Sequence, residues 1–162
     1  MDNEKLLPII RNGLKVPMPI KYHIHPEADL ILYICTGTIS ALEFFKVAEQ
    51  AGFDPHYRNG MKIIIDFFSA DLETTISDLR LAIAENKKVT QRGQALGQTA
   101  VITKSSGLKF LGDALKLMSD SMPAIGMFNT RKDAIKWLNL NASDLPDHWP
   151  SEMEEPPKEN PL

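Results

Sequence analysis

Apolar residues along the chain form short runs that alternate with amphipathic stretches. Residues 20–25 alternate between apolar and polar positions, which is typical of a strand with one buried face. Residues 30–35 are apolar throughout, which indicates a strand inside a sheet. Pro26 and Asp29 supply turn chemistry between the two runs. These features predict an antiparallel hairpin, with the second strand ending at residues 36–38.

Three later apolar runs predict further strands, and each follows a stretch with helical periodicity. The predicted strands are residues 61–68, 98–103 and 124–128. The predicted helices are residues 41–51, 76–86 and 104–118, and a short fourth helix begins after Thr130. Ser40 with Glu43, and Thr75 with Asp78, have the spacing of residues that cap the start of a helix.

Strands that alternate with helices through short links require right-handed crossovers between parallel strands. We therefore predict an α/β domain with a mixed, mostly parallel sheet of four or five strands, an antiparallel edge hairpin and about four helices. The domain spans residues 19–140, after an N-terminal extension at 1–18. Residues 141–162 are acidic and rich in proline, and we expect a mobile tail. Trp149 in this tail either docks on a partner or folds back on its own domain.

Charge and cysteine content narrow the class of protein. The formal net charge of −3 argues against a nucleic-acid partner, because phosphate contacts require a clustered basic face. Cys35 is the only cysteine, so an intrachain disulfide is excluded. No apolar run approaches the roughly 18 to 20 residues of a transmembrane segment, and the first residues do not resemble a secretory signal. We expect a cytoplasmic protein.

Several segments together resemble the SpoIIAA-like branch of the STAS superfamily. They are residues 20–32, Gly37 with Thr38, residues 63–66 and residues 127–138. The resemblance covers about residues 19–140 and implies a sheet of four or five strands with helices. It also implies a role in protein interaction or small-ligand sensing, without enzymatic activity.

The chain departs from that family at the start of the second helix. Anti-sigma-factor antagonists of the family carry an Asp-Ser-Ser-Gly motif there, and its serine is phosphorylated to switch partner binding. Residues 73–78 of this chain read Glu-Thr-Thr-Ile-Ser-Asp. The missing motif puts the phosphorylation switch in doubt, although Thr74, Thr75 and Ser77 retain hydroxyl groups.

Asp66 follows an apolar strand and is the first candidate for a binding site. In parallel α/β sheets, ligands bind outside the carboxyl ends of the strands. We expect four further residues at the same edge: Thr38, Ser105, Ser106 and Arg131. The alternative for Asp66 is a hydrogen bond to nearby backbone amides, and the alternative for the serines is helix capping.

Neither a metal site nor a catalytic set is predicted, and no cofactor is expected. His23 and His25 share one strand face, but the sequence indicates no third ligand. We predict a non-enzymatic regulatory or protein-interaction domain, with a partner surface at the loop after Asp66 and the start of the second helix, where Thr75 and Ser77 lie. The alternative is a module that binds a small anionic or lipid-like ligand in the crevice at the carboxyl ends of the parallel strands. Whether the protein forms a homodimer through the edge of the hairpin is left open by the sequence.

Overall fold

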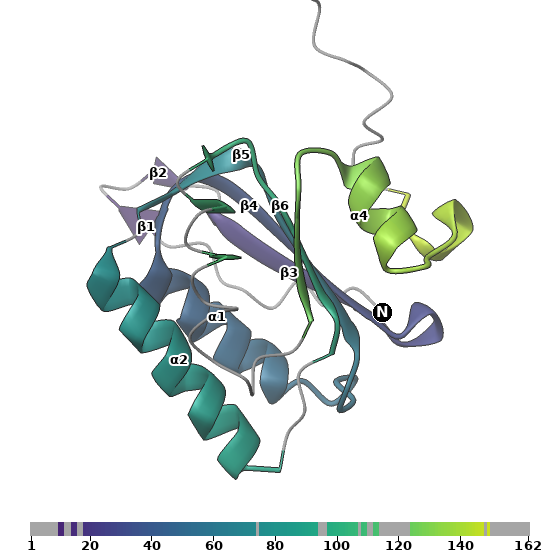
Figure 1. The fold of residues 1–162 in the computed structure, drawn as a ribbon, viewed down its shortest axis with the longest axis horizontal. Coiled ribbons are helices and arrows are strands. Elements are labelled where there is room, and N and C mark those ends of the chain that lie inside the picture. Colours follow the sequence, from purple (N-terminus) through teal and green to yellow (C-terminus); the bar gives the residue numbers. More distant parts are fainter. Residues whose placement is uncertain are drawn as a thin grey trace, which may run out of the picture.

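The computed structural model describes residues 10–11, 14–15, 18–73, 75–93, 97–106, 108–109, 112–113, 124–147 and 149. Five strands form one sheet in the order β3-β4-β5-β6-β7 (Figure 1). The strands span Ile20–His25, Leu30–Ser40, Lys62–Glu73, Thr99–Ile102 and Ile125–Phe128. β3 is antiparallel to β4, and the other neighbours are parallel. The predicted mixed sheet with an antiparallel edge hairpin is confirmed.

Two short strands lie in the expected N-terminal extension. β1 (Ile10–Arg11) and β2 (Leu14–Lys15) pair with each other in an antiparallel arrangement. They form a separate sheet and do not belong to the five-stranded one.

Helices lie on both faces of the five-stranded sheet. α1 (Ala41–Gly52) and α2 (Ile76–Gln91) lie on one side, and α4 (Arg131–Trp137) lies on the other (Figure 1). The capping box of α1 is confirmed, because the Glu43 N–H donates to Ser40 Oγ at 3.2 Å and the Ser40 N–H donates to the Glu43 carboxylate at 2.8 Å. α2 continues past the expected end at Asn86. A further helix is expected over residues 104–118. Of these, residues 106, 108–109 and 112–113 are helical, and 104 and 105 precede the helix. The rest of this range lies outside the described residues.

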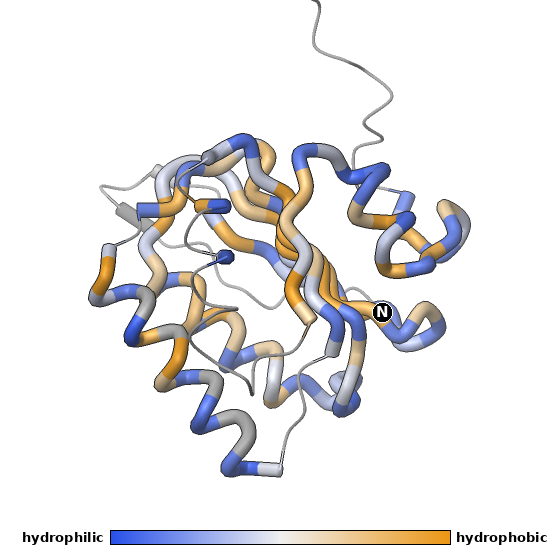
Figure 2. The backbone as a smooth tube through the Cα atoms, viewed as in Figure 1, coloured by the Kyte–Doolittle hydropathy of each residue, from blue (hydrophilic) through white to orange (hydrophobic). Residues whose placement is uncertain are grey.

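Both faces of the central strands are buried, which explains why their sequences are continuously apolar. Ile31, Tyr33 and Ile63 face α1 in one hydrophobic cluster. Leu32 and Ile64 belong to a second cluster, on the side of α4. Figure 2 shows hydrophobic positions concentrated along these strands.

The start of the expected tail packs against the second cluster. Trp149 is 6 % exposed and belongs to this cluster, with half-buried Leu145 beside it. A short 3-10 helix at Ala142–Asp144 precedes them. Of the two alternatives for Trp149, the structure therefore shows the one in which the chain folds back on its own domain. Residues 150–162 lie outside the described residues.

β4 and β5 extend further than the sequence predicts. Residues 36–38 were expected to end the second strand, yet β4 pairs with β5 as far as Ser40 with Glu73. β5 pairs with β6 only over Ile63 to Asp66. The register shifts after Ile34 with Asp66, so that Thr36 pairs with Ser69, and β5 gains one extra residue. Such a bulge bends a strand, and here it directly follows Asp66.

Among the helices in the described ranges, none has the length and apolar composition that a bilayer span requires.

Candidate functional site

Asp66 lies on the α4 side of the sheet at the β5 bulge and is 1 % exposed. Its Oδ1 atom accepts a hydrogen bond from the Phe68 N–H at 2.9 Å. Its Oδ2 atom accepts two, from Arg131 Nε at 2.8 Å and from Trp149 Nε1 at 2.8 Å. Both carboxylate oxygens are therefore engaged inside the protein. The alternative for Asp66, a hydrogen bond to a nearby backbone amide, accounts only for the bond from the Phe68 N–H. The other two bonds come from side chains distant in the sequence.

Arg131 begins α4 and is 8 % exposed. Its guanidinium carbon lies 5.1 Å from the centroid of the Phe68 ring and 5.6 Å from that of Trp149. These are distances at which a cation is attracted to an aromatic face. The ion pair with Asp66 and the two rings thus fix the start of α4 against the sheet. Asp66 and Arg131 lie together, as expected, but in a buried cluster.

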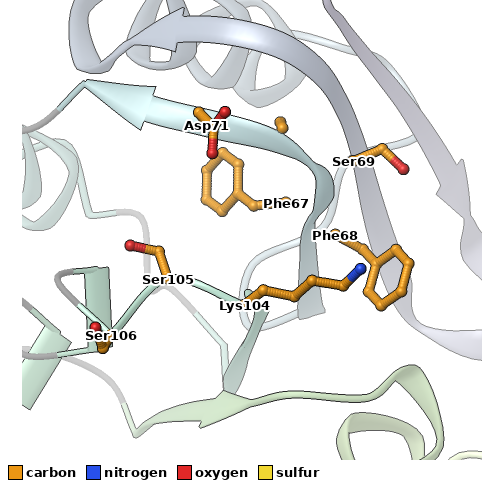
Figure 3. A pocket seen from close by; sticks show the side chains of 8 residues that line it. Phe67, Phe68, Ser69, Asp71, Lys104, Ser105 and Ser106 are labelled. Atoms are coloured by element: carbon orange, nitrogen blue, oxygen red, sulfur yellow. The ribbon is translucent and has the colours of Figure 1, made fainter. Parts of the chain in front are cut away.

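A pocket of about 460 Å³ opens beside the extension of β5. It is lined by Phe67, Phe68, Ser69, Ala70 and Asp71 of β5 and by Lys104, Ser105 and Ser106, which follow β6. Figure 3 shows Asp71 and Phe67 extending from β5 toward the space that Ser105 borders. The volume lies within the range of roughly 300 to 1,000 Å³ that is usual for ligand sites.

The groups on the β6 side of this pocket have different roles. Ser105 Oγ accepts a hydrogen bond from the Leu108 N–H at 3.2 Å, which is the capping role considered as the alternative. Ser106 is exposed. Lys104 Nζ lies 3.8 Å from the centroid of the Phe68 ring, so its charge faces an aromatic surface. The pocket therefore combines one aromatic-bound cation, serine hydroxyls and the Asp71 carboxylate.

The remaining predicted residues lie outside this lining. Thr38 is exposed on β4 and is the register partner of Asp71. Thr75 and Ser77 lie at the start of α2, after β5 has ended. The predicted residues thus fall into three places: a buried cluster, the pocket with its neighbouring strand, and the start of α2. Thr74 lies outside the described residues.

The Thr75 hydroxyl takes part in a helix cap. Thr75 Oγ1 accepts from the Asp78 N–H at 3.2 Å and donates to the Asp78 carboxylate at 3.0 Å. The same carboxylate accepts from the Thr75 N–H at 2.6 Å. This confirms the cap that the spacing of Thr75 and Asp78 predicts, while Ser77 is exposed in the first turn.

Sequence reasoning missed the part of the pocket that β5 contributes beyond Phe68. Ser69, Asp71 and Glu73 are exposed and alternate with half-buried Ala70 and Leu72. This period of two is the pattern of a strand with one buried face. The same alternation is visible in the sequence and could have predicted the longer strand.

Another polar cluster joins β3 to the segment after α1. The Asp54 carboxylate accepts from the His56 N–H at 2.9 Å and from the Tyr22 hydroxyl at 3.1 Å, and the His56 ring lies 3.1 Å away. Burial alone would raise the pKa of Asp54, but these contacts lower it below its ordinary value. Burial, with the Asp54 contact, raises the pKa of Tyr22. The cluster joins two parts of the domain.

His23 and His25 lie side by side, with ring centroids 6.3 Å apart. In the part of the chain that the structure describes, no group of three or more His, Cys, Asp or Glu side chains is placed to hold a metal ion.

Among known proteins, similarity to this chain is found in solved structures. No family model and no curated protein matches the chain. The chain is similar to a protein from Shewanella loihica PV-4, described as an uncharacterised protein of the DUF3478 family with a SpoIIAA-like fold. The two chains are 13% identical, with a TM-score of 0.48, over 74% of this chain and 91% of the other.

Proposed function

We propose that this protein is a non-enzymatic protein-interaction domain whose partner surface lies at the starts of α1 and α2. The supporting observation is the exposure of two large apolar side chains there, Ile76 at 72% and Leu42 at 53%. Ser40 and Glu73, at the ends of β4 and β5, are register partners, and each helix begins shortly after its strand. Both apolar side chains therefore lie at one end of the molecule. Large apolar side chains exposed at the same end of a domain favour contact with another protein.

Hydroxyl groups at the same end offer a means of regulation. A phosphate on Ser77 would add a charge of about −2 in the first turn of α2, where the helix dipole favours an anion. A phosphate on Thr75 would remove the hydroxyl donor to Asp78 and place two anionic groups together. The two positions thus have opposite expected effects on the start of α2.

A site-specific crosslinking experiment tests the proposed surface. A photoreactive amino acid is placed at Ile76 or Leu42 in the native host, and at Phe53 as a control. Phe53 is equally exposed, at 72%, but lies at the other end of α1. We expect positions 76 and 42 to capture the same partner and position 53 not to capture it. Equal capture from all three positions would contradict the proposal.

The partner recovered in this way allows the affinity to be measured. Ile76→Glu should weaken binding about tenfold or more, since an apolar contact is replaced by a charge at the interface. Phe53→Glu is the matched control and should leave the affinity unchanged. Thr75→Asp should change the affinity while the circular dichroism spectrum stays that of the native fold. Unchanged binding of both Ile76→Glu and Thr75→Asp would refute the proposed surface.

A second candidate function, binding of a small anionic or lipid-like ligand, is supported by the pocket beside β5. A ligand that binds only the folded protein stabilises it by about 2.7 kcal/mol at a hundredfold excess over its Kd. A melting-temperature screen of nucleotides, phosphates and fatty acids should then show a hit that Ser106→Trp removes. A screen without any shift would count against this candidate.

A further inference from the structure

β5 lacks a second described partner strand along its final residues. β6 ends at Ile102, and its pairing with β5 stops at Asp66. The chain turns away there, since the Ser105 N–H donates to Thr103 Oγ1 at 3.0 Å and Ser105 caps the helical residues that follow. The space that a longer β6 would occupy beside Phe67 to Asp71 is the pocket of about 460 Å³ (Figure 3).

The backbone of β5 keeps its strand geometry along this pocket. Ser69, Ala70 and Asp71 remain in parallel register with β4. In a parallel ladder, consecutive residues direct their N–H and C=O groups alternately toward the two neighbouring strands. Alternate residues along the pocket therefore direct backbone donors and acceptors away from β4 and toward the pocket, where the described part of the chain provides no pairing strand. Such groups are a template for an added strand.

We propose that this pocket binds an extended peptide segment of a partner protein, which pairs with β5 in the place of a longer β6. The site is separate from the surface at Leu42 and Ile76 and does not depend on it. Its occupant is elongated because the pocket follows five consecutive strand residues, Phe67 to Asp71.

The carboxylates along the end of β5 favour a basic residue in the part of the segment that lies opposite Asp71. Asp71 lines the pocket, and Glu73 is exposed two residues further along the same strand. Lys104 is the cation of the lining, and its ammonium group is placed over the Phe68 ring. A lysine or arginine of the segment opposite Asp71 would form a cross-strand pair of opposite charges.

Selection from a displayed library of random dodecapeptides against the full chain tests this proposal. We expect enriched peptides in which β-branched residues alternate with polar ones around a basic residue. Asp71→Lys should weaken binding of a selected peptide about fivefold or more, since an attractive pair becomes a repulsive one. Glu27→Lys makes the same charge change at an exposed position in the turn between β3 and β4 and should leave binding unchanged. Replacing the peptide's central residues by proline should abolish binding, because the ladder donors are lost.

Ser106→Trp is a second variant, designed to fill the pocket without changing charge, and its fold is checked by circular dichroism. We expect it to remove peptide binding. Failure to select any peptide, or binding that survives both Asp71→Lys and central proline substitution, overturns the proposal. Loss of binding in Ile76→Glu would assign the peptides to the helix-start surface and overturn this inference alone. Binding that depends on Asp71, together with failed crosslinking at Ile76, would overturn the proposed function alone.

Discussion

The indole N–H of Trp149 donates a 2.8 Å hydrogen bond to Oδ2 of Asp66, a residue 83 positions earlier in the chain. Arg131 Nε donates to the same oxygen at 2.8 Å. One buried carboxylate oxygen therefore joins three parts of the protein: β5, the start of α4 and the segment that follows α4.

Trp149→Phe should destabilise the protein by about 1 to 3 kcal/mol. The substitution keeps an aromatic ring but leaves a buried carboxylate without one of its donors. Trp149→Ala should cost more, about 3 to 5 kcal/mol, because it also leaves a cavity. Urea unfolding followed by circular dichroism measures both. Trp137→Phe is the matched control, since Trp137 is half-buried on α4 and packs on Phe128 with ring centroids 5.4 Å apart. Equal costs for the two Phe variants would show that the Trp149 hydrogen bond contributes little.

Arg131→Met should destabilise the protein by about 3 to 5 kcal/mol, because it leaves the buried Asp66 charge without its ionic partner. Asp66→Leu combined with Arg131→Met should recover part of that loss, since no unpaired charge then stays buried. A double-mutant cycle requires the unfolding free energies of Arg131→Met, Asp66→Leu and the variant that combines them. Purely additive losses would mean that the ion pair does not couple these residues.

Asp54 should make the stability depend on pH in the acid range. Its pKa is lowered in the folded protein from an ordinary value of 3.8, so folding favours the charged carboxylate. The resulting stabilisation is fully present above pH 3.8 and is lost as the pH falls through the folded pKa. Comparison of the wild type with Asp54→Asn between pH 2 and 7 measures this contribution. A variant with the same loss of stability on acidification would exclude Asp54 as its source.

Cys35 should be unreactive in the native protein. It is 1 % exposed, and burial together with the nearby Asp66 charge raises the pKa of its thiol to about 12. Only the thiolate is nucleophilic, so a thiol reagent at pH 8 should label the protein only after unfolding. Comparison of labelling rates with and without denaturant checks this. Rapid labelling of the folded chain would contradict the burial of Cys35.

The sequence could predict the hairpin, the three parallel strands and the helix caps because their signals are local. Alternation over residues 20–25 and the spacing of Ser40 and Glu43 act over a few residues. The same reasoning placed the ends of β4 and β5 too early in the chain. Polar residues such as Thr38 and Asp71 are typical of loops when each is judged without its neighbours. In the structure they form the exposed side of a paired extension.

The candidate site was predicted only in part. Ser105 and Ser106 lie at the carboxyl end of β6, as strand order requires, and Asp66 meets Arg131. The sequence did not indicate that this pair is buried or that a pocket forms beside Asp71. Both depend on the bulge after Asp66 and on the early end of β6.

The sequence by itself determined the order and type of the main elements, since periodicity and capping are set by residues close together in the chain. Only the tertiary structure decided that Trp149 covers its own domain and that the Asp66 carboxylate is already engaged. Those contacts join residues 65 and 83 positions apart, and they form only when the whole sheet has positioned them.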